Sequence, residues 1–198
     1  MRIAILDYGT GNLHSLAKAV NATGAEVRIE SDPSAAVESD VLMLPGVGAF
    51  TSATDILAPH REVLSSALRR GLPCLGICLG MQLLFDTSEE GPGKGLGFIP
   101  GRVRKLRASR VPQIGWNSID EANDSLFDVA PLSTAYFANS YVCEPEDSAS
   151  AIAWATHDGD RFVAAARSGN VVGVQFHPEK SSAAGCDFIR AFLESARR

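Results

Sequence analysis

Hydrophobic residues in the first half of the chain form short apolar runs that alternate with longer segments of helical spacing. The runs cover residues 3–6, 27–29, 41–44 and 74–77, and the helical segments cover about 12–23, 54–70 and the residues from 79 onward. The second helical segment ends at Gly71 with Pro73 just beyond it, a usual arrangement at a helix C-terminus. Short buried strands that alternate with helices imply a parallel sheet covered on both faces.

The second half of the chain consists mainly of strand-like runs that follow one another. These runs cover residues 103–106, 133–141, 151–155, 162–166 and 171–176. Turns such as His157-Asp-Gly-Asp160 separate them, so we expect antiparallel strands joined to the parallel sheet. A last helix is predicted over 185–197, with its large apolar side chains on one face. The predicted fold class is therefore α/β, with a mostly parallel sheet, helices on both of its faces and an added antiparallel part.

The length and the apolar content of the chain are those of a globular protein. The 198 residues, 45% of them hydrophobic, predict a single domain, 1–198, with a full core. No apolar run approaches the roughly 20 residues that a membrane-spanning helix needs. The run at 3–6 is also much shorter than the apolar part of a signal peptide. We therefore expect a soluble, cytoplasmic protein that binds no membrane.

The charge of the chain makes nucleic acid an unfavourable partner. A net charge of -5 and a pI near 5.4 provide no general attraction to polyanions. The local exception is a basic cluster, formed by Arg102, Arg104, Lys105, Arg107 and Arg110. Because blocks of like charge usually lie in solvent, we interpret it as a solvated strand and turn. A surface that faces a partner or a phosphate-bearing ligand is the alternative.

The cysteines differ in their surroundings. None of the four has the C-x-x-C spacing of a zinc or redox site, so we expect free thiols and no bound metal: Cys74, Cys78, Cys143 and Cys186. Cys78 lies in Gly76-Ile-Cys-Leu-Gly80, between a strand and a predicted helix, which is the layout of a nucleophile elbow. The N-terminus of such a helix favours the nucleophilic thiolate. Cys74 is interpreted as a core residue of the strand, and the elbow pattern alone leaves open that Cys78 is one too.

His177 is the histidine best placed to act as a base. It follows the run at 171–176, and Pro178 after it stops strand pairing. Residues i and i+2 of an extended chain point the same way, so Glu179 is predicted to hold the imidazole. The other histidines, His14, His60 and His157, have ordinary surface or capping positions. Cys78, His177 and Glu179 thus form a candidate nucleophile, base and orienting carboxylate.

Acyl transfer also needs hydrogen-bond donors for a developing oxyanion. The backbone N–H of Leu79, directly after Cys78, is the first candidate. The second is the peptide of Val47 in the turn Pro45-Gly-Val-Gly48, where the glycines allow unusual backbone orientations. We hypothesise that the Val47 peptide completes the oxyanion hole and reorients when the enzyme is switched on.

Five motifs, taken together, resemble those of a known enzyme family. They are Asp7-Tyr-Gly-Thr-Gly-Asn12, Pro45-Gly-Val-Gly-Ala-Phe50, Gly76-Ile-Cys-Leu-Gly-Met-Gln82, Gly115-Trp-Asn117 and Phe176-His-Pro-Glu-Lys-Ser181. In this order along the whole chain they resemble the glutaminase subunits of imidazole glycerol phosphate synthases, which belong to the class I, triad-type glutamine amidotransferases. The resemblance implies the flavodoxin-like sheet of that class.

The resemblance also implies a reaction and the residues that perform it. Cys78 would attack the side-chain amide of glutamine, His177 would protonate the leaving ammonia, and water would hydrolyse the glutamyl thioester to glutamate. Gln82 would help to hold the glutamine in a pocket lined by Gly48, Ser140 and Tyr141. No cofactor is implied.

A partner protein follows from the same resemblance. Ammonia would pass to a (β/α)8-barrel cyclase subunit, and this heterodimer would make imidazole glycerol phosphate and an aminoimidazole carboxamide ribotide in histidine biosynthesis. Asn12, Trp116 and Lys180 resemble family positions at that subunit interface. Gln113 and Asn139 depart from the family, which often has histidine at both positions. The sequence leaves open how these two residues affect substrate positioning.

Three other functions remain open from the sequence. Gly9-x-Gly11 after the first strand, with Glu30 further on, is a weak match to a nucleotide-binding fingerprint, because His14 replaces its third glycine. A cysteine hydrolase or peptidase would use the same triad on a different substrate. A catalytically silent assembly subunit would carry the triad without using it.

Overall fold

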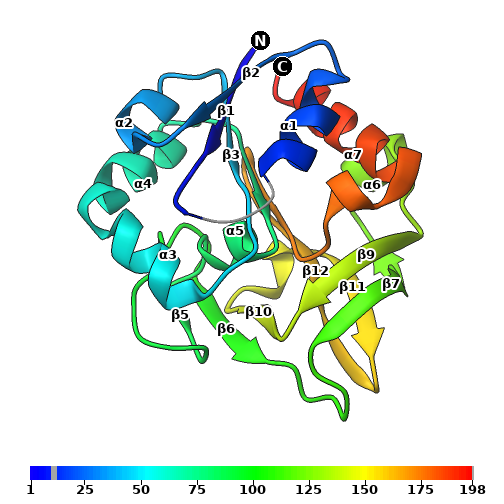
Figure 1. The fold of residues 1–198 in the computed structure, drawn as a ribbon. Helices are drawn as coiled ribbons and strands as arrows, with labels where there is room; N and C mark the ends of the chain where they lie inside the picture. Colours follow the sequence, from blue (N-terminus) through cyan, green and yellow to red (C-terminus); the bar gives the residue numbers. More distant parts are fainter. Residues whose placement is uncertain (10–12, 198) are drawn as a thin grey trace.

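A computed structural model describes residues 1–9 and 13–197, and its parallel half has the predicted architecture (Figure 1). Five parallel strands lie side by side in the order β2-β1-β3-β4-β13. Their bounds are β1 (Arg2–Leu6), β2 (Glu26–Glu30), β3 (Val41–Leu44), β4 (Cys74–Ile77) and β13 (Val171–Val174). Numbered among themselves they follow the order 2-1-3-4-5 of flavodoxin-like sheets, so the predicted fold class is confirmed.

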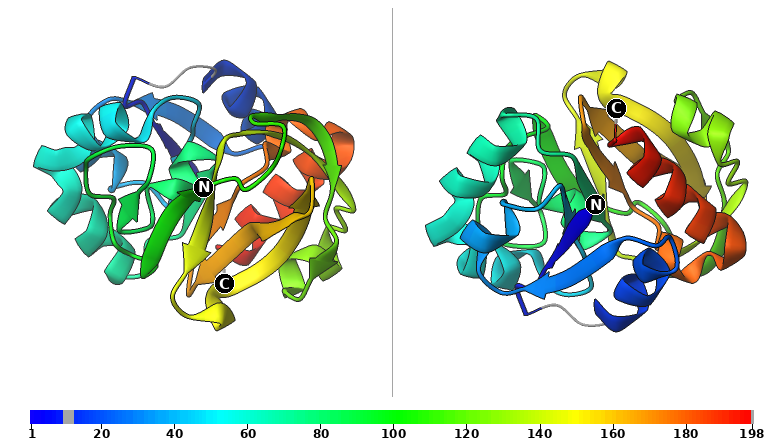
Figure 2. Two further views of the ribbon diagram at one scale, coloured as in Figure 1. Left: turned by 90° about the horizontal axis from the view of Figure 1, so that it is seen from below. Right: turned by 90° about the horizontal axis from the view of Figure 1, so that it is seen from above.

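The two faces of the sheet are covered by different helices, as Figure 2 shows. Ile3 and Ile5 of β1 belong to one apolar core with residues of α1 and α7, whereas Ala4 and Leu6 belong to a second core with residues of α3 and α4. This alternation is that of a strand buried on both faces. The helices are α1 (Leu13–Asn21), α2 (Pro33–Ala36), α3 (Phe50–Leu57), α4 (Arg61–Arg69), α6 (Ser125–Val129) and α7 (Ser182–Ser195). No helix within the described ranges is long and apolar enough to cross a membrane.

The antiparallel part continues the same sheet beyond β13. It comprises β12 (Asp160–Ser168), β10 (Tyr141–Pro145), β6 (Gly101–Lys105) and β5 (Thr87–Ser88), while β11 (Ala151–His157) pairs with β12 and with β8 (Glu121–Ala122). Asp158 and Gly159 join β11 to β12 with φ of 48° and 84°, the positive values of a type I′ hairpin turn. A separate two-stranded sheet is formed by β7 (Gln113–Ser118) and β9 (Thr134–Asn139).

The helix predicted over 54–70 is wrong as a single element. α3 already begins at Phe50, whose backbone N–H donates to the Glu90 carboxylate at 2.8 Å. Pro59 has no N–H to continue an α-helix, and a 3₁₀ turn, η1 (Ala58–His60), separates α3 from α4 there. The last helix likewise begins at Ser182 rather than at the predicted residue 185.

The strand predicted over 133–141 is divided between two sheets. β9 ends at Asn139 and β10 begins at Tyr141, so Ser140 lies where the chain passes from the small sheet to the main one. The sequence pattern does not predict β7, because its one fully buried side chain is the polar Gln113. The separate small sheet was therefore not foreseen.

The basic cluster is occupied by ion pairs within the protein. Arg104 donates two hydrogen bonds to Asp160, at 2.7 and 2.9 Å, and both side chains are more than nine-tenths buried. Arg102 pairs with Glu144 at 2.8 Å, and Arg110 contacts the carboxylate of Asp158 at 3.5 Å. The prediction of a wholly solvated cluster is wrong for Arg104. These carboxylates compete with any phosphate for the cluster, so nothing favours the phosphate-binding alternative.

Candidate active site

Cys78 occupies a strained elbow directly after β4. Its φ of 52° and ψ of -105° are unusual for a residue with a side chain. A Cβ on Gly80 would lie 1.9 Å from the carbonyl oxygen of Leu44, and a Cβ on Gly76 would lie 2.7 Å from that of Gly80. The backbones of β3, β4 and the elbow are therefore in direct contact, which explains why the G-x-C-x-G motif needs its glycines.

The helix after the elbow begins at the predicted residue but is very short. α5 (Leu79–Gln82) is a single turn, and the macrodipole of so few aligned peptides is small. The expectation that a helix N-terminus favours the thiolate therefore finds little support. Side-chain and backbone groups surround the sulfur instead. Gln175 Nε2 lies 3.4 Å from Cys78 Sγ, and the carbonyl oxygen of Ala138 lies 3.8 Å from it.

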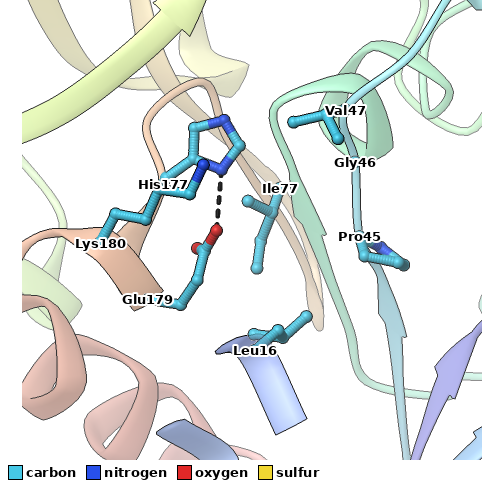
Figure 3. Close-up of a pocket in the computed structure, with 8 residues that line it drawn as sticks. All are labelled: Leu16, Pro45, Gly46, Val47, Ile77, His177, Glu179 and Lys180. Atoms are coloured by element: carbon cyan, nitrogen blue, oxygen red, sulfur yellow. Dashed lines mark hydrogen bonds and ion pairs between the residues drawn. The ribbon is translucent and has the colours of Figure 1, made fainter. Parts of the chain in front are cut away.

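His177 and Glu179 form a buried hydrogen-bonded pair (Figure 3). Nδ1 of His177 and Oε1 of Glu179 are 2.9 Å apart, and the side chains are 2% and 6% exposed. The predicted contact is present, although the reason given for it is wrong. β13 ends at Val174, and Glu179 lies in a 3₁₀ turn, η3 (Pro178–Lys180), rather than in extended chain.

The environment of His177 favours the charged imidazole. Burial lowers its pKa, but the hydrogen-bonded carboxylate of Glu179 and the nearby sulfur of Cys78 outweigh burial and raise the pKa to about 9. The ring is therefore protonated at neutral pH. Nε2 is buried without a hydrogen-bond partner in the described part of the chain, and no hydrogen bond within normal distance joins it to Cys78. That nitrogen is free for a group that reacts at the sulfur.

Backbone and side-chain hydrogen bonds fix the His177 turn against β9. The N–H of His177 donates to the carbonyl of Tyr136 at 2.8 Å. The buried hydroxyl of Ser181 donates to the carbonyl of His177 at 2.7 Å and accepts from the N–H of Tyr136 at 2.9 Å. Ser181 thus helps to position the His177 turn against β9. It belongs to the quoted motif, but the sequence did not indicate this role.

A pocket of about 180 Å³ opens beside Cys78. It is lined by Val47, Gly48, Cys78, Leu79, Gln82, Glu90, Ala138, Asn139, Ser140 and Tyr141. Both predicted oxyanion residues and all four predicted substrate-binding residues therefore line the same pocket as Cys78. Glu90 was missed by the sequence interpretation, and its position beside the glycine-rich stretch 91–97 was the available signal.

The Val47 turn separates this pocket from a second, smaller space. That space, of about 10 Å³, lies beside His177 and Glu179, and Val47 is across from the imidazole of His177 in Figure 3. Its other lining residues are Leu16, Pro45, Gly46, Ile77, Glu179 and Lys180. Val47 thus lines both the pocket beside Cys78 and the space beside His177 and Glu179.

An exposed aromatic and basic patch lies on the small sheet and the His177 turn. Trp116 is 58% exposed and packs edge-on against Tyr136, with 6.4 Å between the ring centroids. Nζ of Lys180 lies 5.7 Å from the centroid of the same Tyr136 ring. Two predicted interface residues are thus joined through Tyr136, which was not predicted. The third, Asn12, lies outside the described residues.

Gln113 and Asn139 face each other across β7 and β9. They are 3% and 4% exposed. Asn139 Nδ2 donates to the carbonyl of Tyr141 at 3.1 Å, whereas the Asn139 oxygen and both polar atoms of the Gln113 amide have no partner in the described residues. Buried amides without partners are costly, so this pair is locally unfavourable. Asn139 lines the pocket, whereas Gln113 is not among its lining residues.

Comparison with known proteins defines the class of the chain. Its sequence matches the family model of the class I glutamine amidotransferases over residues 4–196. The chain therefore belongs to the class I glutamine amidotransferases, and it is an enzyme of that class rather than a nucleotide-binding module or a peptidase.

The relatives define the family within that class. A protein of Methanothermobacter thermautotrophicus is 45% identical, covering 98% of this chain and 99% of its own length. Proteins of Thermus thermophilus and of Corynebacterium glutamicum are 44% and 40% identical, covering 100% and 96% of this chain and 98% and 97% of their own lengths. Each is named imidazole glycerol phosphate synthase subunit HisH, and the chain belongs to this family.

Solved structures agree on the fold. The chain is similar to a glutamine amidotransferase crystal structure with a TM-score of 0.78 and 19% identity, each chain being covered to 99%. It is similar to a chain in the structure of PurLQS from Thermotoga maritima with a TM-score of 0.70 and 19% identity, each chain being covered to 98%. Both likenesses span the parallel and the antiparallel parts.

Proposed function

We propose that this chain is the glutamine-hydrolysing subunit of an imidazole glycerol phosphate synthase, with Cys78, His177 and Glu179 as its catalytic triad. The observation that carries the proposal is the buried, Glu179-bonded His177, whose pKa of about 9 is raised partly by the neighbouring Cys78. With a protonated imidazole beside it, the cysteine can act as the nucleophile at neutral pH, and the imidazole can act as the acid.

In the first half-reaction the thiolate of Cys78 attacks the side-chain amide carbon of glutamine. A carbon–sulfur bond forms, and the amide oxygen becomes an oxyanion. Nε2 of His177 then donates its proton to the amide nitrogen, the carbon–nitrogen bond breaks, and ammonia leaves. The unpartnered Nε2 is the nitrogen available for this transfer, because Nδ1 is held by Glu179.

In the second half-reaction water hydrolyses the glutamyl thioester. Neutral His177 now accepts a proton from water as the oxygen attacks the thioester carbon. The carbon–sulfur bond breaks, glutamate leaves, and the thiolate and imidazolium are restored together. Glu179 stabilises the imidazolium that forms at this stage.

The pocket supplies groups for the oxyanion and the substrate. The N–H groups of Leu79 and Val47 are the proposed oxyanion donors, since both residues line the pocket beside Cys78. Glu90 offers the pocket a carboxylate, which suits the α-ammonium group of glutamine. Gln82 and the segment of Ser140 and Tyr141 complete the contact surface for the substrate.

The exposed patch of Trp116, Tyr136 and Lys180 is the proposed docking surface for the cyclase subunit in a heterodimer. Tryptophan and tyrosine are enriched at protein interfaces, and Lys180 places a positive charge beside these two rings. Ammonia is mostly ammonium in water at neutral pH, and docking would keep it from solvent on its way to the cyclase. The cytoplasmic location stays a prediction.

The decisive experiment measures glutamate production by the complex. Glutamine, the purified cyclase subunit and its nucleotide substrate are combined with wild-type protein or with Cys78→Ser. We expect glutamate from the wild type only, and normal synthesis by both complexes when ammonia replaces glutamine. Equal glutamate production by both proteins would refute the proposal, and loss of the ammonia-dependent reaction in Cys78→Ser would assign Cys78 a structural role.

A further inference from the structure

Gln175 lies against the sulfur of Cys78 and is fully buried. It follows β13 directly, and its backbone N–H donates to the carbonyl of Ala164 at 2.8 Å, which fixes its position beside β4. Its side-chain nitrogen, Nε2, is 3.4 Å from Cys78 Sγ, a normal distance for an N–H donor and a sulfur acceptor. Packing alone does not explain a buried amide in contact with a nucleophile, since burial of an amide is costly unless its hydrogen bonds are made.

We propose that Gln175 is a further catalytic residue, whose side-chain N–H holds the nucleophilic sulfur of Cys78 as a thiolate, and that Gln82 orients it for this role. This inference rests on the proposed function, because it takes Cys78 to be the nucleophile. It adds the side-chain N–H of Gln175 as a hydrogen-bond donor to the sulfur of Cys78, a role that neither the sequence motifs nor the family assignment gives to this residue.

The orientation of the Gln175 amide follows from a chain of hydrogen bonds. The carbonyl oxygen of Tyr141 can only accept, so the Gln82 atom 3.2 Å from it is the donor Nε2. The same Nε2 lies 3.3 Å from an atom of the Gln175 amide, which is therefore the acceptor Oε1. The other end of Gln175, the end that faces Cys78, must then be the N–H donor.

This donor acts differently on the two forms of the sulfur. A hydrogen bond to the charged form of a group stabilises that form. The thiol has its own acceptor, the carbonyl oxygen of Ala138 at 3.8 Å, but the thiolate has no proton to give to it. Gln175 therefore favours the thiolate, and it does so without titrating. It complements the imidazolium of His177, whose contribution disappears when the ring loses its proton.

The same chain connects the nucleophile to the substrate pocket. Gln82 lines the pocket with Cys78, and its Nε2 is engaged by Tyr141 and Gln175. Its Oε1 is then the atom that remains for a donor group of glutamine. A substrate that binds Gln82 through this oxygen keeps the Gln82 amide in the orientation that aims Gln175 at the sulfur.

The test measures the reactivity of Cys78 without glutamine. Iodoacetamide alkylation of the full chain is followed by mass spectrometry from pH 5 to pH 10, in a Cys186→Ser background, because Cys74 and Cys143 are buried. The variants are Gln175→Leu, which removes the donor, and Gln175→Glu, which keeps the shape but places a carboxylate against the sulfur. Gln113→Leu is the matched control, since it removes another buried amide that makes no hydrogen bond to Cys78.

We expect alkylation at pH 7 to slow about tenfold in Gln175→Leu and further in Gln175→Glu, with the midpoint of the pH profile moved to higher pH. The Gln113→Leu profile should match the parent. In the complex with the cyclase subunit, Gln175→Leu should lower kcat more than it raises KM. If Gln175 only fills space, the alkylation rate of Gln175→Glu should stay close to that of the parent and Gln175→Leu should be the slower variant. That result would overturn the inference.

Two further measurements keep the test decisive. Urea denaturation establishes that each variant is folded. Gln82→Met leaves Gln175 in place but removes the amide that orients it. Alkylation of Cys78 in this variant should be slower than in the parent and faster than in Gln175→Leu. Unchanged profiles in both Gln175 variants would reject the inference alone. Glutamate production by the wild type against Cys78→Ser would still decide the proposed function separately.

Discussion

The two walls of the site around Cys78 are built in different ways. The elbow wall, residues 45–48 and 76–82, is held by backbone in direct contact with backbone, as the glycines Gly76 and Gly80 show. The strand wall, residues 138–141 and the turn 177–181, is held by hydrogen bonds between side chains and backbone. Close backbone contact leaves the nucleophile almost no freedom of position. A wall held by side chains tolerates exchange of residues more readily, and it contains Asn139, which pairs with Gln113 of β7.

The largest expected effect comes from a methyl group placed in the elbow wall. Gly80→Ala forces a Cβ to within 1.9 Å of the Leu44 carbonyl oxygen, so we expect a loss of roughly 4 kcal/mol or more in the free energy of unfolding. Gly115→Ala in β7 is the control, because nothing lies within 4 Å of its Cβ. Its φ of +129° predicts only backbone strain, of roughly 1–3 kcal/mol. Urea denaturation compares the two, and equal losses would contradict the close backbone contact inferred for the elbow wall.

The next effect is on catalysis from the strand wall. Glu179→Gln removes the carboxylate that holds His177, so its imidazole loses the charge that keeps it oriented and protonated. We expect kcat for glutamine in the cyclase complex to fall about 100-fold, while ammonia-dependent synthesis stays unchanged. Glu194→Gln, on the exposed end of α7, serves as the control. A Glu179→Gln enzyme with normal kcat would remove Glu179 from the triad.

A smaller effect links the stability of the protein to pH. The folded pKa of His177 is about 9, above the value of 6.5 for an unperturbed histidine. A raised folded pKa stabilises the folded state fully below pH 6.5, and this contribution is lost as the pH rises through 9. Urea midpoints of the wild type should therefore fall between these pH values by more than those of His177→Gln. Parallel curves for the two proteins would contradict the raised pKa.

The smallest effect compares a satisfied with an unsatisfied buried polar group. Ser65 in α4 donates to the Leu96 carbonyl at 3.0 Å, so Ser65→Ala should lose about 1 kcal/mol of unfolding free energy. Gln113→Leu removes an amide without partners in the described residues and should be neutral or stabilising by about 1 kcal/mol. Differential scanning calorimetry measures both. A large loss in Gln113→Leu would mean that its amide has an unseen partner, such as an ordered water.

The elbow wall was the more predictable of the two from the sequence. The strands before Cys78 and before Pro45 were predicted with the bounds that the structure has, because each is a short, wholly apolar run. The contact between His177 and Glu179 was also predicted, since the two residues lie in one local motif. The strand wall was not, because its construction depends on pairing between distant segments: β7 carries a buried amide, and Ser140 divides one apparent strand between two sheets. Gln175 and Glu90 were missed for the same reason, as only the folded chain brings them to Cys78 and its pocket.

The path of β9 has a consequence for how this sequence can change over evolution. Tyr136 of that strand belongs to the exposed patch with Trp116 and Lys180, and Ala138, about 7 Å further along, contacts the sulfur of Cys78. A shift of the strand that altered the exposed patch would also move the carbonyl beside the sulfur of Cys78. Residues 136–139 are therefore constrained both by the exposed patch and by the contact with Cys78. We expect substitutions to accumulate more slowly there than in the exposed hairpin at Asp158 and Gly159, which has neither constraint.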